Sequence, residues 1–329
     1  MTVKETAHGA KSTIFEDENM PDLIIKENRN PNNINNQGWL SKQMKGYNII
    51  KRIRESGLDY GVELPELIEI VDTPEKKQII EKKLYGKDFT TEIYNELDKE
   101  KKEELAIQMA KFFNAMHQME KPKPAKNSLK EQLVAFTPWM QSAQDIINVF
   151  ENNLSPKLET TLRDAEKILD NTDKSDEICV NTHTDIRFQN VMYNPENNKL
   201  SVIDFEMTQF DNIYQDFVPS CHGLSWDFIQ RVIKHYNNIP NKKYPITINP
   251  NKVKNGLIFS IAHEYARVLY LNKRENLNPD VKEQANVLLH RLTEDSLLDF
   301  SETELFNQGI KKLETYKQNV PQTLGTERS

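Results

Sequence analysis

The strongest constraint on this chain is a set of polar residues at fixed spacing. His183, Asp185 and Asn190 form the pattern His-x-Asp-x-x-x-x-Asn, and Asp204 follows fourteen residues after Asn190. The residues between Asn190 and Asp204 predict a β-hairpin, because two short apolar runs flank the turn signal Asn-Pro-Glu-Asn-Asn at 194–198. A hairpin there returns Asp204 to the loop that carries the other three residues.

Two carboxylates and one amide placed together suit phosphoryl transfer. One carboxylate would accept or orient the proton of an acceptor hydroxyl, while the amide and the second carboxylate would hold Mg²⁺ on the phosphates of ATP. Magnesium takes few hard oxygen ligands from a protein and completes its shell with phosphates and water. The spacing therefore predicts a site for ATP and Mg²⁺.

Composition excludes several other classes of protein. The 329 residues suit two domains or one large two-lobed unit. Fifty acidic residues against 43 basic ones give a net charge of −7, which argues against a nucleic-acid partner. We find no apolar run long enough to span a membrane, no signal-like start and only two cysteines, so we expect a cytoplasmic protein.

The two parts of the chain differ in hydrophobic periodicity. Up to residue 85 the pattern predicts a small β-rich lobe with one helix at Trp39–Ser56, which ends before Gly57. The strands of this lobe are expected at 22–26, 66–71 and 78–84. From Leu97 onward apolar residues recur mostly at helical spacing. Further helices are expected at 129–150, at 156–169 and around 253–269.

These motifs resemble those of a known superfamily. The segment His183–Asn190 resembles the H-G-D-x-x-x-x-N catalytic loop of aminoglycoside phosphotransferases and choline kinases, and is similar to H-R-D-x-x-x-x-N of protein kinases. Asp204-Phe205-Glu206 is similar to their magnesium motif, and Tyr214-Gln215-Asp216 resembles the segment that follows it. The resemblance implies an α+β, protein-kinase-like fold with two lobes. Residues 1–85 would form the nucleotide-binding lobe, and residues 86–329 the mainly helical catalytic and acceptor-binding lobe.

The resemblance implies roles for the catalytic loop. Asp185 would be the catalytic base, or would orient the acceptor hydroxyl, while Asn190 and Asp204 would bind Mg²⁺. Arg187 falls where protein kinases have a lysine that reaches the transferred phosphate, so it would stabilise the transferring group electrostatically, or else form a surface salt bridge. Glu206 would contact the metal or the acceptor, or would simply replace a glycine.

We expect structural roles for three other residues, the first of them implied by the resemblance. His183 would support the catalytic loop rather than carry a proton, and Asp216 would accept hydrogen bonds that fix this loop. His117 is expected to be a packed histidine at the end of a helix.

The nucleotide would be held by the first lobe. Lys26 would meet the α and β phosphates, and backbone amides of the loop Gly9–Thr13 would cradle the phosphates. The hinge Ile80–Leu84 would hydrogen-bond adenine through its backbone. The residues expected to contact the nucleotide are Gly9, Ser12, Thr13, Lys26, Glu81, Lys82 and Lys83.

One part of the kinase pattern is missing. Protein kinases pair the phosphate-binding lysine with a glutamate on the helix that corresponds to Trp39–Ser56. Here Gly46 occupies that place, Gln43 is a poor substitute and Glu55 comes too late in the helix. The sequence therefore identifies no acidic partner for Lys26.

The expected acceptor is the hydroxyl of a small molecule that is choline-like or ethanolamine-like, aminoglycoside-like or sugar-like. Asp204-Phe205-Glu206 favours choline or ethanolamine, whereas Tyr214-Gln215-Asp216 favours antibiotics. A protein kinase is one alternative, although an A-P-E segment is lacking. A nucleotide-binding pseudokinase is another, and the missing glutamate supports it. No nucleic acid or membrane partner is expected.

Overall fold

The structure is a computed structural model. It describes residues 3–8, 12–28, 38–73, 76–135, 137–150, 154, 156–171, 174–218 and 224–275. The chain divides into two compact units, one of residues 1–129 with 173–253 and the other of residues 130–172 with 254–329. The lobe boundary that the sequence suggests near residue 85 lies inside the first unit, and it remains a prediction.

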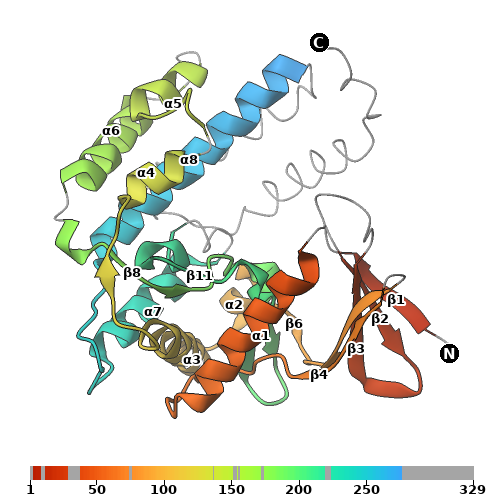
Figure 1. Ribbon diagram of the computed structural model, residues 1–329. Coiled ribbons are helices and arrows are strands. Elements are labelled where there is room, and N and C mark those ends of the chain that lie inside the picture. Colours follow the sequence, from red (N-terminus) through yellow and green to blue (C-terminus); the bar gives the residue numbers. More distant parts are fainter. Residues whose placement is uncertain are drawn as a thin grey trace. The chain divides into compact units, whose positions relative to one another are not determined.

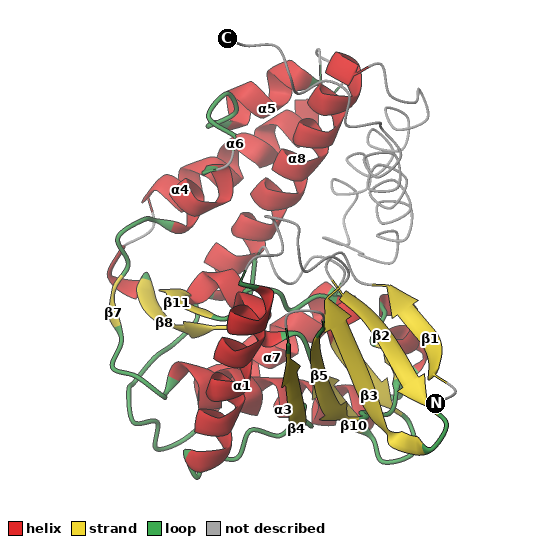
Figure 2. Ribbon diagram, turned by 45° about the vertical axis from the view of Figure 1, so that its right-hand side comes forward, coloured by secondary structure: helices red, strands yellow, loops and turns green. Residues whose placement is uncertain are grey.

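The first unit begins with a five-stranded antiparallel sheet (Figure 2). Its strands lie in the order β1-β2-β3-β5-β4. They are β1 (Val3–His8), β2 (Ser12–Asp17), β3 (Met20–Asn28), β4 (Leu67–Asp72) and β5 (Lys77–Lys82). The expected strands at 22–26, 66–71 and 78–84 are confirmed, with ends shifted by a few residues.

Helix α1 (Trp39–Glu55) is the single helix expected in this region. It buries apolar residues at helical spacing, among them Tyr47, Ile50 and Ile53. Gly38, in the left-handed region at φ 78°, precedes its first turn.

The rest of the first unit contains helices and two three-stranded sheets. Helices α3 (Lys99–His117) and α7 (Trp226–Asn238) pack side by side (Figure 1). The sheets have the orders β10-β9-β6 and β11-β8-β7. The smaller elements are β6 (Lys87–Asp88), α2 (Thr91–Glu96), β7 (Lys123–Pro124), β8 (Ile178–Thr182), β9 (Val191–Asn194), β10 (Lys199–Val202) and β11 (Gln209–Asn212). The expected hairpin is therefore confirmed as β9–β10.

The single helix expected at 129–150 is wrong. The chain forms two helices there, α4 (Leu129–Val134) and α5 (Ala143–Val149). Pro138 lies between them, and a proline inside a helix removes one hydrogen bond and clashes with the preceding turn. Ser142 and Asp145 then form a capping box that starts α5. The remaining helices are α6 (Pro156–Asn171) and α8 (Pro250–Glu275).

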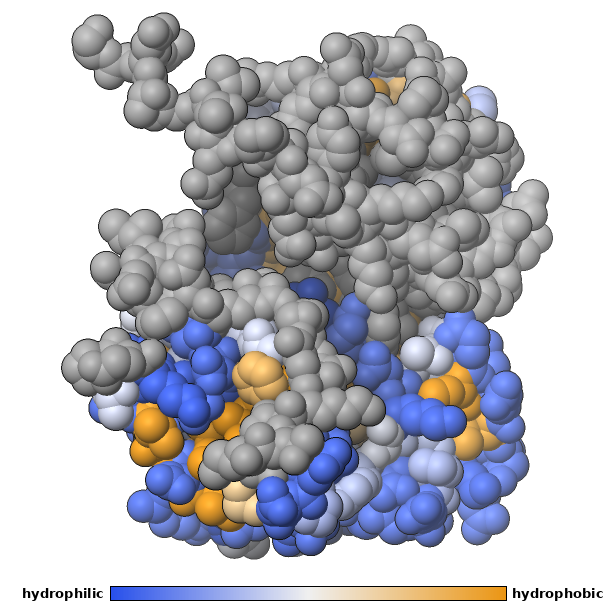
Figure 3. All heavy atoms as spheres, turned by 90° about the vertical axis from the view of Figure 1, so that its right-hand side faces the viewer, coloured by the Kyte–Doolittle hydropathy of each residue, from blue (hydrophilic) through white to orange (hydrophobic). Residues whose placement is uncertain are grey.

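Few large apolar side chains are exposed among the described residues. Figure 3 shows hydrophilic residues around small hydrophobic patches on the coloured part of one face. Large apolar side chains exposed among the described residues are Leu58, Ile68, Ile70, Tyr85, Trp139 and Met207. No helix in the described ranges has both the length and the apolar character needed to cross a lipid bilayer.

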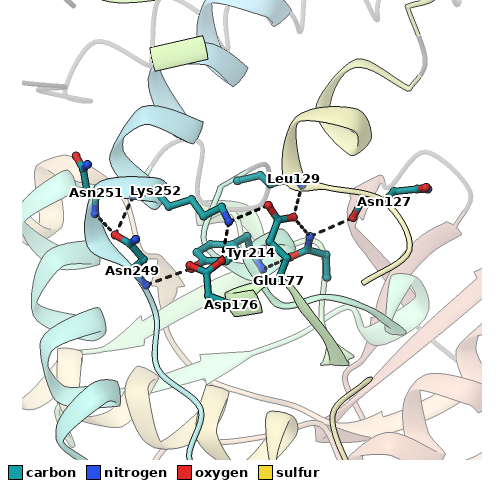
Figure 4. A network of polar contacts seen from close by, with 9 residues as sticks. Asn127, Leu129, Asp176, Glu177, Tyr214, Asn249, Asn251 and Lys252 are labelled. Carbon is teal, nitrogen blue, oxygen red and sulfur yellow. Dashed lines mark hydrogen bonds and ion pairs between the residues drawn. The ribbon is translucent and has the colours of Figure 1, made fainter. Parts of the chain in front are cut away.

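A buried ion network joins the first turn of α8 to the start of β8 (Figure 4). The ammonium of Lys252 lies 2.7 Å from Asp176 and 2.8 Å from Glu177, and its side chain is fully buried. The hydroxyl of Tyr214 donates to Asp176, while Asn212 donates to Glu177. Because each carboxylate has a second donor, the buried charges are compensated.

Replacement of Lys252 by methionine should lower the free energy of unfolding by about 3–5 kcal/mol, because Glu177 is left charged and buried without its cation. Urea unfolding monitored by circular dichroism measures this change. The matched control is Lys234→Met, since Lys234 is 67% exposed and lies 3.6 Å from Glu103. The control should change stability by less than about 1 kcal/mol. Equal losses in both variants would contradict the prediction.

Candidate functional site

The loop after β8 brings the predicted catalytic residues together. Asn190 donates its side-chain amide to a carboxylate oxygen of Asp185 at 2.8 Å and to the backbone oxygen of the same residue at 2.9 Å. The other carboxylate oxygen of Asp185 accepts from Nε of Arg187 at 2.6 Å. The Asp185 side chain is 17% exposed and that of Arg187 is 53% exposed. The carboxylate is thus oriented from both sides and still reachable from solvent.

A second layer of hydrogen bonds fixes the shape of this loop. Thr184 has φ 64°, which is uncommon for a threonine, and its backbone amide donates to Asp216 at 2.9 Å. The other carboxylate oxygen of Asp216 lies 3.1 Å from Nε2 of His117, and both side chains are fully buried. Asp216 therefore has the structural role that the sequence predicts, and His117 is the packed helix-end histidine expected.

His183 supports the loop as a neutral ring. Its Nε2 donates to the carbonyl of Ile203 at 3.1 Å, and its Nδ1 accepts from the backbone amide of Asp185 at 3.3 Å. These partners require one protonated and one bare ring nitrogen. Burial lowers the pKa of His183. The geometry agrees with a supporting residue rather than a proton carrier.

Asp204 lies two residues after the end of β10 and directly before the 3₁₀ turn η4 (Phe205–Met207). Its φ is 63°, in the left-handed region. Burial raises the pKa of the Asp204 carboxyl, and the charge of Glu206 adds to this shift while Lys26 opposes it. The ring of Phe205 packs against that of His183 with centroids 4.6 Å apart. The hairpin thus carries Asp204 to the catalytic loop, as the spacing predicts.

The phosphate-binding lysine of the prediction, Lys26, lies on β3 in an ion pair. Its Nζ is 2.8 Å from a carboxylate oxygen of Glu81 on β5, and the two side chains are 12% and 3% exposed. Burial alone would lower the pKa of Lys26, but Glu81, helped by Asp204, raises it above its ordinary value. The sequence interpretation overlooked this contact, because it assigned Glu81 to the hinge only through its backbone.

Helix α1 presents three buried residues to this site at the spacing i, i+3, i+4. Gln43 donates to Glu206 at 3.0 Å, and the hydroxyl of Tyr47 donates to Glu81. A Cβ at Gly46 would lie 2.8 Å from the Cβ of Phe205, so only glycine permits this approach without a shift. The helix therefore contacts the site through an amide, a glycine and a phenol.

The predicted phosphate loop falls at the connection between β1 and β2. Ser12 and Thr13 are the first two residues of β2, and Thr13 is buried. Gly9 lies outside the described residues. The role of the three residues in phosphate binding remains a prediction.

The hinge backbone is partly engaged already. The amides of Lys82 and Lys83 donate to the carbonyls of Glu66 and Asp22 at 2.9 and 2.7 Å. Among the described residues, no backbone acceptor pairs with the amide of Leu84. The amides of Lys82 and Lys83 are therefore occupied, whereas the amide of Leu84 would be available to a nucleobase.

The model of the phosphotransferase enzyme family (APH) matches residues 47–238. This range covers more than half of the chain and includes the catalytic loop and Asp204, so the chain belongs to this family. A search of curated proteins gives no match.

Solved structures share the fold. The ADP-bound aminoglycoside phosphotransferase APH(2'')-Ib has 17% identity and a TM-score of 0.54, over 88% of this chain and 92% of that one. The GDP and kanamycin complex of an APH(2'') enzyme has 14% identity and a TM-score of 0.58, over 88% and 92%. Spectinomycin phosphotransferase APH(9)-Ia, in complex with ADP and spectinomycin, has 15% identity and a TM-score of 0.52, over 93% and 94%. The kinase-like α+β fold expected from the sequence is thereby confirmed.

The buried neutral His183 should make stability depend on pH. An unfolded histidine titrates near pH 6.5, whereas the pKa of His183 in the folded chain is lower. The unfolded chain therefore binds more protons in the window below about pH 6.5, and stability is lost as pH falls through it. Urea unfolding at pH 7.5 and 5.5 should show a smaller loss in His183→Gln than in wild type. Equal losses would contradict this.

Proposed function

We propose that this phosphotransferase moves the γ-phosphoryl group of ATP to a hydroxyl of a small molecule. The observation that carries the proposal is the contact of Asp185 with Asn190 in a loop whose charges also act on Asp204. Asp204 in turn interacts electrostatically with Lys26, which extends the cluster to the five-stranded sheet. This set provides a base, metal ligands and a phosphate-binding cation.

The residues fit a magnesium site. The cluster holds more carboxylates than cations: Glu81, Asp185, Asp204 and Glu206 against Lys26 and Arg187. The described residues contain no group of three or more His, Cys, Asp or Glu side chains arranged to hold a metal ion. The protein would therefore supply only two oxygen ligands, from Asn190 and Asp204, and phosphates and water would supply the others, as magnesium commonly requires. Bound Mg²⁺ would neutralise charge on the phosphates.

The nucleotide is proposed to be ATP, held by Lys26 and by backbone groups of the hinge. Relatives with the same fold have been solved with ADP or with GDP. Both nucleotides present the same phosphates to Lys26, so the binding experiment below compares an adenine with a guanine nucleotide.

Arg187 has two tasks in this proposal. In the structure it neutralises the carboxylate of Asp185, which an acceptor hydroxyl must reach. Its half-exposed side chain leaves the guanidinium able to turn toward the transferring phosphoryl group. When the guanidinium turns away from Asp185, one carboxylate oxygen becomes free to accept the hydroxyl proton, while Asn190 keeps the other oxygen in place.

The acceptor is proposed to be a small alcohol of the choline-like or ethanolamine-like, aminoglycoside-like or sugar-like classes. Two relatives with this fold were solved with kanamycin or spectinomycin. Phosphorylation of a protein substrate is an outcome that the experiment below would reveal.

Replacement of Asp185 by asparagine should abolish phosphoryl transfer and leave nucleotide binding largely intact, because this carboxylate acts on the acceptor hydroxyl. Asp204→Asn should lose magnesium-dependent nucleotide binding as well, because it removes a charged ligand. Consumption of ATP with Mg²⁺ is measured across choline, ethanolamine, aminoglycosides, sugars and a generic protein, and binding by calorimetry with Mg-ADP and Mg-GDP.

Exposed Glu69→Gln on β4 serves as the control and should behave as wild type. Normal turnover in both site variants would show that the site assignment is wrong. Turnover with the protein substrate alone would replace the small-molecule acceptor.

Arg187→Ala should lower turnover about 10–1000-fold, since electrostatic groups at a transferring centre contribute on that scale. Nucleotide affinity should stay within about threefold of wild type, because the exposed guanidinium holds Asp185 rather than the nucleotide. Arg187→Lys retains the charge and should recover part of the rate. An unchanged rate in Arg187→Ala would show that Arg187 has no role in the transfer and only forms a surface ion pair.

A further inference from the structure

The acidic partner of Lys26 comes from a neighbouring strand. Strands β3 and β5 are antiparallel, with Lys26 opposite Ile79 and Ile24 opposite Glu81. Lys26 and Glu81 are therefore diagonal neighbours on the same face of the sheet, where long side chains can meet. Their charged atoms lie 2.8 Å apart. The register of two adjacent strands thus creates the pair.

Burial makes this pair an effective positioning device. Glu81 is 3% exposed and Lys26 is 12% exposed, so water hardly competes for either charge. A buried carboxylate without its cation is strongly disfavoured, which holds the ammonium in one place. The Lys26 ammonium has three protons, and contact with Glu81 uses one of them. Two N–H groups remain for phosphate oxygens.

Helix α1 acts on the acid of this pair. The hydroxyl of Tyr47 donates to the carboxylate oxygen of Glu81 that Lys26 does not contact. Burial and the charge of Glu81 raise the pKa of Tyr47, so the phenol stays a proton donor. The neighbouring residues on this face, Gln43 and Gly46, carry no charge. The helix therefore fixes the carboxylate but does not supply it.

We propose that Glu81, held by Tyr47, is the positioning residue that aims Lys26 at the phosphates of the nucleotide, in place of a helix-borne glutamate. This inference rests on the proposed function, because it assumes that Lys26 binds phosphate. Both residues of the lysine ion pair then belong to the same sheet. The lysine is then oriented by the β3–β5 register, and α1 contributes one hydrogen bond.

The test is a double-mutant cycle on nucleotide affinity. Calorimetry with Mg-ADP, and separately with Mg-GDP, compares wild type, Lys26→Met, Glu81→Gln and the double variant. Glu81→Gln should raise Kd about tenfold, the loss expected when a charged partner is removed. The double variant should bind no more weakly than Lys26→Met, because Glu81 acts through Lys26. A purely structural role for Glu81 would instead add its effect to that of Lys26→Met.

Two further variants secure the result. Tyr47→Phe keeps the ion pair and should raise Kd about threefold, an effect that disappears in the Glu81→Gln background. If Glu81→Gln does not fold, the Kd of Tyr47→Phe tests the inference instead. Glu69→Gln, an exposed acid on β4, is the matched control and should bind as wild type.

The outcomes separate the two proposals. If wild type binds neither nucleotide, the proposed function is wrong and this inference falls with it. If wild type and Glu81→Gln bind equally well, or if the effects of Glu81→Gln and Lys26→Met multiply, Glu81 does not position Lys26. The proposed function is untouched in that case. If Glu81→Gln does not fold, wild-type affinity in Tyr47→Phe overturns the inference in the same way.

Discussion

The buried ion pair between Lys26 and Glu81 is the interaction on which the proposed nucleotide site depends. Removing two charges from water is unfavourable by several kcal/mol per ion, so such a pair persists only with good geometry and further hydrogen bonds. The antiparallel register of β3 and β5 supplies the geometry, and Tyr47 supplies the extra hydrogen bond. A slip of one residue between these strands would move one charge to the other face of the sheet. The register of β3 and β5 that pairs the strands is thus also the register that the proposed nucleotide binding requires.

The proposed catalytic residues depend on an uncommon backbone conformation. Thr184 and Asp204 both lie in the left-handed region, which is unfavourable for residues with a side chain by about 1–3 kcal/mol each. Two hydrogen bonds hold Thr184 there: the buried Asp216 accepts from its backbone amide, and the backbone carbonyl of Met207 accepts from its hydroxyl. Thr184 directly precedes Asp185, and Asp204 is itself a carboxylate that the proposed reaction requires. The surrounding network, which reaches His117, explains how the loop keeps this shape.

The sequence predicts local features well and cross-strand partners poorly. Asp185, Asn190 and Asp204 could be placed together because a short hairpin with a clear turn links them. The helix expected across Pro138 failed because apolar spacing was given more weight than the proline. Glu81 was assigned to the hinge from its position in the sequence. It lies two residues after the apolar Ile79, so both side chains are on the same face of β5, and this spacing indicates an acid that points toward the core. Such an acid needs a cation, and Lys26 becomes that cation only once the register of β3 and β5 is known.

The charges of the site link binding to folding. Burial, Glu206 and Asp185 all raise the pKa of Asp204. A carboxyl with a raised pKa binds more protons in the folded chain than in the unfolded one, so the fold loses stability as pH rises through that window. At neutral pH the site therefore favours any cation that relieves the repulsion. A magnesium–nucleotide complex that binds only the folded chain would restore stability by mass action. The carboxyl whose raised pKa weakens the free fold, that of Asp204, is one that the proposed reaction requires.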